Sequence, residues 1–276
     1  MAGWITWAGS AHFPLDERGG VIEHPVRVQA RGRKLEDLKH LEQAGAAILQ
    51  LDITDGQQNI NDTIAKAISI YGRVDVLVNN ASYISIGTWE DLEYGDFLAQ
   101  FDTNVFGTIK VTRPLLPHFR QRRAGTIVFI SFLSGWIGHA GCSAYAGSKN
   151  CGRSLAGNRT LGIKTLLIEP GRFRTKLLSK NKMKAVISTI PEYAEFSKTR
   201  VATLSKEDQA QPGDPVKLVE TILDLVRQEG ITEGREVPFR LPLGRDVYGD
   251  MKTKCEETLK LLEEWKTTIR STDLEE

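Results

Sequence analysis

The 276-residue chain is predicted to fold as a single α/β domain built on a doubly wound parallel sheet. Three observations predict this. Apolar, β-branched runs alternate with helical patterns, which is typical of parallel βαβ units with right-handed crossovers. The run over residues 74–78 is apolar enough for a strand buried on both faces, and two asparagines follow it. One α/β domain of this length can bury a substantial core.

The expected elements follow in chain order. Strands are predicted at 26–30, 46–51, 74–78, 126–131 and 165–169, and helices at about 34–43, at 57–71 and within 102–123. Residues 176–210 are polar and predicted to be irregular. Asp214 is a plausible N-cap and Pro215 a first helical residue for an apolar-periodic helix over 216–227.

The C-terminal region is predicted to add a helix to the domain. Residues 1–245 form the predicted domain, and residues 246–276 form a C-terminal helical extension. Leu259, Leu262 and Trp265 make one apolar stripe along it, which indicates packing or an oligomer contact.

Composition excludes several classes of function. The 36 basic and 35 acidic side chains nearly cancel, whereas an electrostatic nucleic-acid binder normally shows a basic excess. The chain has no run of about 18 apolar residues, and its opening lacks the pattern of a secretory signal. The three cysteines have no metal-like spacing and are expected to be reduced. A soluble cytoplasmic protein is predicted, with no nucleic-acid, membrane or metal partner.

Tyr145 and Lys149 form the most informative pair of residues. Residues four apart share one helical face, so the lysine cation lies beside the phenol. A tyrosine titrates near ~10, and moving its pKa to about 7 needs roughly 4 kcal/mol in favour of the phenolate. One cation about 4 Å away supplies a similar energy at an effective dielectric constant near 20. The alternative is a tyrosine that packs beside a solvated lysine.

Several segments together resemble the short-chain dehydrogenase/reductase family over roughly residues 25–245. The segments that carry the resemblance are Asn79-Asn80-Ala81-Ser82, Asn104, Tyr145-x-x-x-Lys149 and Pro170-Gly171. The resemblance implies a Rossmann-like fold and hydride transfer between a nicotinamide cofactor and a carbonyl or alcohol carbon. The residue sequences of two motifs resemble those of fungal members of the family, some of which tailor secondary metabolites. One expected substrate is therefore a polyketide-type or hydrophobic carbonyl compound.

The resemblance assigns the proton-transfer roles. Tyr145 is expected to protonate the carbonyl oxygen, and Lys149 to lower the pKa of that tyrosine and to bind the nicotinamide ribose. Asn104 is expected to hold a water that links Lys149 to solvent. The alternative for Asn104 is an asparagine that bends or caps a helix.

The resemblance also assigns cofactor contacts. Asp52 is expected to bind the adenine amino group, the alternative being an aspartate that caps a turn or helix. Asn80 is expected at the adenosine ribose, and Thr175 with the backbone of Phe173 at the carboxamide and phosphates. Arg113 is a weaker candidate, with an exposed surface arginine as the alternative.

The end of the second expected strand favours NADP (NADPH) over NAD. Arg31 lies there in a basic turn without an acidic residue, and an arginine at this point accommodates the extra phosphate. The alternative is a basic turn on a solvated surface. With NADP, reduction of a ketone or aldehyde is the expected direction.

The serine that the family places thirteen residues before its tyrosine is missing. Phe132 occupies that register. Ser131 is the neighbouring candidate for its catalytic role, although side chains alternate along a strand and Ser131 points away unless a bulge turns it. Ser134 and Ser143 are further alternatives. The sequence predicts a reductase that is weak, or inactive on the substrates that relatives accept. Phe132→Ser is expected to raise the catalytic rate constant at least tenfold, provided that the cofactor still binds.

The N-terminal segment departs from the family as well. Its glycine-rich motif falls in the register of residues 6–13, where Trp7, Ala11 and Phe13 take glycine positions. Either the cofactor binds poorly, or the first ~25 residues are not the family's own segment. Ser82 also replaces a family glycine. The stretch over 150–161 is shorter than the family helix that often joins subunits, which weakens the inference of a homo-oligomer.

The expected partner is a small-molecule carbonyl or alcohol substrate covered by residues 176–210. Five residues there line an apolar pocket or belong to the core: Met183, Ile187, Ile190, Tyr193 and Phe196. Two other functions stay open. One is a catalytically silent relative that binds a nucleotide or protein, and the other is a structural subunit.

Overall fold

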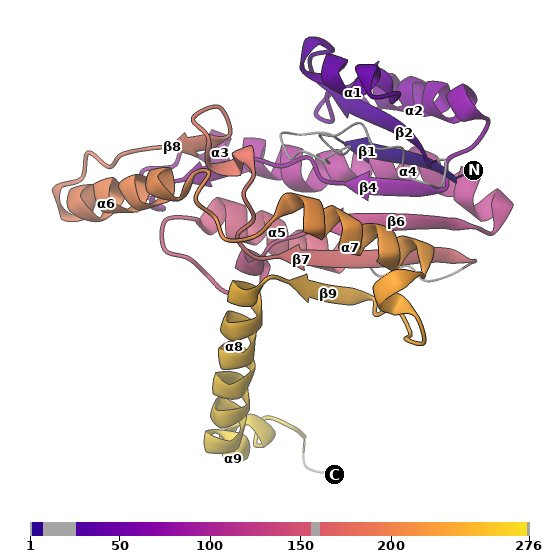
Figure 1. The fold of residues 1–276 in the computed structure, drawn as a ribbon. Helices are drawn as coiled ribbons and strands as arrows, with labels where there is room; N and C mark the ends of the chain where they lie inside the picture. Colours follow the sequence, from indigo (N-terminus) through magenta and orange to yellow (C-terminus); the bar gives the residue numbers. More distant parts are fainter. Residues whose placement is uncertain (1, 8–25, 156–160, 275–276) are drawn as a thin grey trace.

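The computed structural model describes residues 2–7, 26–155 and 161–274. A seven-stranded sheet crosses the molecule, with helices on both of its faces (Figure 1). Its strand order is β3-β2-β1-β4-β6-β7-β9, and every neighbouring pair is parallel. The predicted doubly wound α/β fold is confirmed.

The strands of this sheet are β1 (Ala2–Trp7), β2 (Val26–Gly32), β3 (Ala47–Gln50), β4 (Val76–Asn79), β6 (Gly125–Ile130), β7 (Ile163–Pro170) and β9 (Arg240–Leu243). The helices are α1 (Lys39–Gln43), α2 (Gln57–Tyr71), α3 (Tyr94–Phe101), α4 (Gly107–Arg122), α5 (Ser143–Leu155), α6 (Pro191–Glu207), α7 (Pro215–Arg227), α8 (Arg245–Glu264) and α9 (Lys266–Arg270). β5 (Ile84–Ile86) and β8 (Met183–Ala185) form a separate two-stranded sheet.

The core has two layers, one on each face of the sheet. Leu77 and Phe129 point to one face, where they meet the buried sides of α2 and α4. Val76, Val78 and Val128 alternate with them and meet α7 on the other face. Because helices cover both faces, the central strands are apolar along their whole length, as the sequence of residues 74–78 predicts.

The local signals for helices gave accurate boundaries where they were strong. The helix predicted at 57–71 is α2, and the helix predicted at 216–227 is α7, which begins one residue earlier. Asp214 caps α7 as predicted, because its Oδ1 accepts a 2.8 Å hydrogen bond from the Val216 amide. The helix expected at 34–43 is shorter, since its first part is a 3₁₀ turn, Glu36–Leu38.

The prediction that residues 176–210 are irregular is wrong. They contain β8 and the 17-residue helix α6, which begins with Pro191 at its first position. Proline fixes φ near the helical value and is well tolerated there. The helix escapes a periodicity argument because it has no continuous buried stripe: Tyr193 and Phe196 are exposed, while Ser197 and Leu204 are buried.

The carboxyl ends of the parallel strands meet at one edge of the sheet. The segments after β4, β6 and β7 leave from this edge and carry Asn80, Ser131 and Gly171. Ligands of open α/β sheets bind at such an edge. Trp7 ends β1 at the same edge, whereas Ala11 and Phe13 of the altered glycine motif lie outside the described residues.

The C-terminal helix α8 projects away from the sheet (Figure 1). Val247 and Met251, near its start, are its buried residues. Leu259, Leu262 and Trp265 of the predicted stripe are exposed, so the stripe is not packed against the described part of the chain. Among the described residues, no helix combines the length and apolar character needed to cross a membrane.

Candidate active site

Tyr145 and Lys149 lie together on α5, as the sequence predicts. Both are buried, with 1% and 8% of their surface exposed. The Lys149 Nζ atom is 5.7 Å from the centre of the Tyr145 ring, and it donates a 3.0 Å hydrogen bond to the Ile130 carbonyl at the end of β6. The helix therefore holds an acid and a cation against the carboxyl edge of the sheet.

Burial governs the ionisation of both groups. It lowers the pKa of Lys149 to about 8 and raises the pKa of Tyr145 above its usual value. Cys142 adds to the rise at Tyr145, and the nearby Ser82 hydroxyl opposes it. The predicted lowering of the Tyr145 pKa by Lys149 is wrong for this structure, because loss of water outweighs any stabilisation of the phenolate by the amine.

Asn104 connects three segments around the tyrosine. It lies in a π-helical turn, Asp102–Phe106, between α3 and α4. Its Nδ2 donates to Ser148 Oγ at 2.9 Å and to the Tyr83 carbonyl at 3.3 Å, and its Oδ1 accepts from the Tyr83 amide at 3.3 Å. Ser148 in turn donates to the Tyr145 carbonyl at 2.7 Å. The water-holding role of Asn104 stays a prediction, and the π-helical turn agrees with the helix-bending alternative.

The structure does not support the predicted catalytic role of Ser131. Its hydroxyl is buried and donates to the Lys149 carbonyl at 3.2 Å, so its proton is used to hold α5. Phe132, in the register of the missing serine, packs edge-on against Tyr145 with ring centres 5.8 Å apart. An aromatic ring thus lies beside the phenol, at the position where the family resemblance expects a serine.

A buried ion pair supports the loop beyond Phe132. Glu169 at the end of β7 is fully buried and pairs with Arg240 of β9, whose Nη2 lies 2.8 Å from Glu169 Oε1. Trp136 Nε1 donates to the same oxygen at 3.0 Å, and the Arg240 guanidinium stacks 3.8 Å from the centre of the Trp136 ring. Sequence reasoning missed this cluster, because its members are far apart along the chain.

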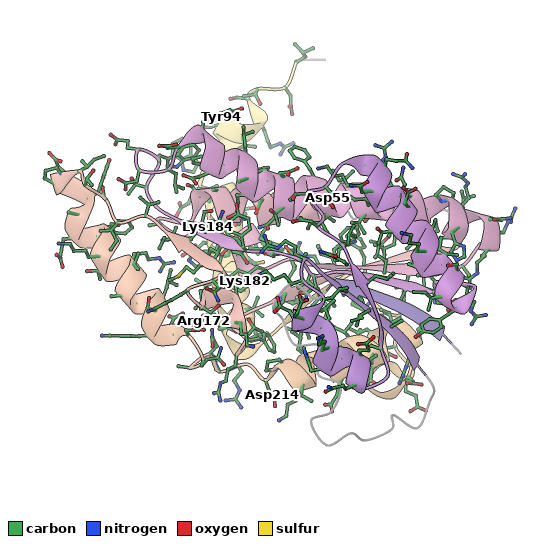
Figure 2. All side chains as sticks on the ribbon, turned by 90° about the horizontal axis from the view of Figure 1, so that it is seen from above. Asp55, Tyr94, Arg172, Lys182, Lys184 and Asp214 are labelled. Carbon is green, nitrogen blue, oxygen red and sulfur yellow. The ribbon has the colours of Figure 1, made fainter. Side chains whose placement is uncertain are left out.

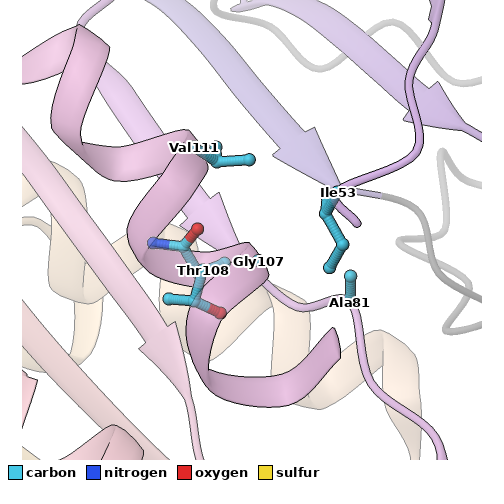
Figure 3. A pocket seen from close by; sticks show the side chains of 6 residues that line it. Ile53, Ala81, Gly107, Thr108 and Val111 are labelled. Carbon is cyan, nitrogen blue, oxygen red and sulfur yellow. The ribbon is translucent and has the colours of Figure 1, made fainter. Parts of the chain in front are cut away.

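The nucleotide side of the edge contains a shallow hollow (Figure 3). Ile53 and Ala81 line it opposite Gly107, the first residue of α4. A Cβ on Gly107 would lie 2.8 Å from the Ile53 side chain, so a larger residue here would require that side chain to shift. The hollow lies beside Asp52, where the family resemblance expects an adenine.

Two of the predicted nucleotide contacts lie next to this hollow. The Asn80 side-chain Nδ2 is buried and has no hydrogen-bond partner among the described residues, a state that a ligand oxygen would relieve. Asp52 Oδ1 accepts from the amide and hydroxyl of Thr54 at 3.0 and 2.7 Å, which is the turn-capping alternative. The unpartnered Asn80 amide therefore fits a nucleotide oxygen, whereas the contact of Asp52 with an adenine stays a prediction.

The loop after β7 holds the other predicted contacts. Thr175 Oγ1 accepts from the Leu177 amide and caps a short 3₁₀ turn, and Phe173 pairs with Gly213 through the backbone. Gly171 lies so close to Asp246 of α8 that a Cβ would be 2.0 Å from the carboxylate. Asp246 accepts a 2.7 Å hydrogen bond from the Arg172 amide, so the start of α8 fixes this loop.

The basic residues of the nucleotide side are unequally placed. Arg113 is exposed on α4, and the Arg31 side chain lies outside the described residues, although its backbone is in β2. Lys182, just before β8, is half-buried, and its pKa is lowered by burial and then by Arg33, with Asp37 acting in the opposite direction (Figure 2). Sequence reasoning missed Lys182, since residues 33 and 182 are brought together only by the fold.

Comparisons with known proteins agree with this geometry. The family model described as short chain dehydrogenase matches residues 21–185. The chain belongs to the short-chain dehydrogenase family. It is 30% identical to Oxidoreductase BOA17 of the fungus Botryotinia fuckeliana, with 95% of each chain covered.

Solved structures resemble the chain over most of its length. A short-chain dehydrogenase from Streptomyces avermitilis is 32% identical and superposes with a TM-score of 0.83, covering 99% of this chain and 98% of that one. ElxO, solved with NADP bound, is 22% identical with a TM-score of 0.64 over 87% of this chain and 96% of its own, and this likeness shows the fold alone. The protein thus belongs to a family of oxidoreductases.

Proposed function

We propose that the protein reduces a carbonyl compound with NADPH, and that it can run the reverse oxidation of the alcohol. The observation that carries this proposal is the buried pair of Tyr145 and Lys149 on one face of α5, held by the Asn104 and Ser148 hydrogen bonds. A phenol and an amine buried at the ligand-binding edge of the sheet are costly unless they are used.

The side chains divide the work of proton transfer and binding. Tyr145 donates its hydroxyl proton to the carbonyl oxygen as the alcohol forms. Lys149, with its pKa near 8, supplies a positive charge at neutral pH that stabilises the resulting phenolate and contacts a ribose. Asn80, Asp52 and Thr175 would hold the cofactor, which supplies the hydride when it is bound.

NADP is proposed over NAD because positive charge gathers after β2. Arg31 is the last residue but one of β2, and Arg33 follows the strand. Lys182, in the segment before β8, lies close enough to Arg33 for the two charges to repel each other. No acidic residue follows β2 before Glu36. A 2′-phosphate would reduce the repulsion between these cations, whereas the hydroxyl of NAD would not.

The substrate proposed is a hydrophobic ketone or aldehyde. Met183 lies partly buried against the cluster that contains Tyr145, while Ile187, Tyr193 and Phe196 are exposed on the segment that begins at β8. The sequence left two alternatives for these side chains, a substrate pocket or the core. Because they are exposed, they do not belong to the core, and we assign them to the covering of the substrate. Tailoring of secondary metabolites by a fungal enzyme is the biological setting that we propose.

Two measurements test the proposed function. The first titrates the intrinsic fluorescence of the five tryptophans with NADPH and with NADH. Tighter binding of NADPH is expected, and Arg31→Ala should weaken NADPH far more than NADH; equal losses would contradict the choice of NADP. The second follows NADPH oxidation with a panel of aliphatic and aromatic aldehydes and ketones.

The same pair of measurements separates the rival functions. Binding of NADPH without oxidation of the cofactor would indicate a silent relative. Absence of binding would indicate a structural subunit. The oligomeric state is to be measured by light scattering on the full chain, which tests whether the protein forms a homo-oligomer.

A further inference from the structure

Two departures from the family pattern meet at Tyr145. By the family resemblance, Phe132 stands where a serine is expected to bind the reacting oxygen, and Ser82, in the segment after β4, stands where a glycine is expected. Residues 82 and 132 are 50 positions apart in sequence, yet the Phe132 ring and the Ser82 hydroxyl both lie next to the buried phenol. One departure removes a hydroxyl from this place, and the other adds one.

The Ser82 hydroxyl is buried and available. Its Oγ has no hydrogen bond of ordinary geometry among the described residues. It nevertheless lies near enough to Tyr145 to oppose the rise in the pKa of that residue. A buried hydroxyl without a full partner is costly, and a carbonyl oxygen placed beside Tyr145 would satisfy it.

The backbone around Ser82 is held rigidly. The next residue, Tyr83, donates its amide to Asn104 Oδ1, and its carbonyl accepts from Gln100 Nε2 at 2.9 Å. Gln100 is fully buried and also accepts from the Ser85 amide at 2.8 Å. A donor on such a fixed segment loses little entropy when it binds the substrate, as electrostatic catalysis requires.

The other hydroxyls near Tyr145 are less suitable. The Ser131 proton is used on the Lys149 carbonyl. Ser143 Oγ is buried and lacks a described partner as well, but Ser143 is the first residue of α5, whereas Ser82 directly precedes Tyr83, whose backbone is held by Asn104 and Gln100. These contacts select Ser82 among the serines of this region.

We propose that Ser82 donates a hydrogen bond to the reacting carbonyl oxygen beside Tyr145, and so replaces the hydroxyl that Phe132 excludes. This inference rests on the proposed function. In the reduction, the hydride would come from a C–H bond of NADPH, which is oxidised to NADP⁺; as the new bond to the carbonyl carbon forms, the C=O π pair moves to oxygen and the Tyr145 proton neutralises that oxygen. Ser82 keeps its own proton throughout and stabilises the developing negative charge.

The direct test removes the Ser82 hydroxyl. Ser82→Ala and Ser82→Gly are expected to lower kcat by about 10²-fold or more, the usual effect of deleting one oxyanion donor. KM and the Kd of NADPH should change less than about threefold, since the interaction is made in the transition state. Ser82→Thr keeps a hydroxyl and should retain most of the rate. Thr232→Val deletes a buried hydroxyl in the turn after α7 and serves as the matched control.

A serine introduced at position 132 gives a second, independent test. The sequence alone predicts that Phe132→Ser raises the rate of the wild-type protein. If Ser82 already supplies the donor, Phe132→Ser should raise kcat little in the wild-type background and at least tenfold in the Ser82→Ala background. The thermal unfolding midpoint of each variant is measured alongside, because Phe132 packs in two apolar clusters.

The outcomes distinguish this inference from the proposed function. A wild-type protein that oxidises NADPH and keeps its rate in Ser82→Ala overturns the role of Ser82 alone. So does a loss of rate in Ser143→Ala that Ser82→Ala does not share. A folded wild-type protein that binds NADPH but reduces none of the carbonyls overturns the proposed function and the inference together.

Discussion

The two halves of the candidate site differ in the kind of polar group that they leave without a protein partner. On the side of β4, β6, β7 and β9, buried side chains are joined by short hydrogen bonds: Asn104 with Ser148, Lys149 with Ile130, and Glu169 with Arg240. At the nucleotide end of the site, the Asn80 amide nitrogen that follows β4 lacks a described partner, and Lys182 and Arg33, near the end of β2, repel each other.

This difference separates the roles of the halves. In the proton-transfer half, protein contacts fix Tyr145, Lys149 and Asn104, while the neutral hydroxyls of Ser82 and Ser143 lack a described partner. The nucleotide half leaves buried polar atoms and excess positive charge that an anionic nucleotide would satisfy. Substitutions in the first half should therefore affect turnover or stability, and substitutions in the second should affect cofactor binding.

The largest expected effect is the loss of turnover in Tyr145→Phe. This change deletes the proton donor and little else, so kcat should fall by 10²-fold or more. The Kd of NADPH, measured by fluorescence titration, should stay within about twofold. Lys149→Ala should damage both, because the lysine serves the tyrosine and the ribose. Retention of most of the rate in Tyr145→Phe would contradict the assignment of the acid.

The next effect concerns the stability of the proton-transfer half. Arg240→Met leaves Glu169 fully buried without its ion partner, which should lower the free energy of unfolding by about 3 to 5 kcal/mol. Urea denaturation measures the change. Lys252→Met removes an exposed pair with Glu256 on α8 and should cost less than about 1 kcal/mol. Similar losses of unfolding free energy in the two variants would show that burial does not make the Glu169–Arg240 ion pair more important than the exposed Lys252–Glu256 pair.

A smaller effect is expected in the nucleotide half. Lys182→Met removes one of the cations near the end of β2 and should weaken NADPH about tenfold while leaving NADH nearly unchanged. Lys184→Met is the matched control, because Lys184 is exposed and lies over the Tyr83 ring. Added salt should reduce the difference between the cofactors. A loss of both cofactors in Lys182→Met would instead indicate damage to the loop.

The smallest effect is a dependence of reduction on pH. The pKa of Lys149 is lowered to about 8, so the lysine loses its positive charge as pH rises through that value. If the cation is needed, kcat/KM should fall about threefold between pH 7.5 and 8.5. Lys149→Arg keeps a charge at every pH in this range and should abolish this fall, whatever its residual rate. A flat profile for the wild-type protein would show that the charge of Lys149 is not required.

Sequence patterns predicted the sheet, α2, α7 and the positions of Tyr145, Lys149 and Asn104, because these depend on local periodicity and on spacing within one helix or motif. The direction of the Tyr145 pKa could not be predicted, since spacing shows a neighbouring cation but not the extent of burial. Helix α6 was missed because its exposed apolar residues give no stripe. The Glu169 and Arg240 pair and the approach of Lys182 to Arg33 depend on long-range folding, which no local pattern shows.

The contact between Asp246 and the loop after β7 has a consequence for how the C-terminal region can vary. The first turn of α8 fills the space beside Gly171 and accepts from the Arg172 amide, while the residues beyond Met251 extend away from the sheet. The chain can therefore lengthen, shorten or exchange the outer turns of α8 without changing the loop that carries Phe173 and Thr175. A single insertion between Leu243 and Asp246, in contrast, would rotate the carboxylate away from that loop by about 100°.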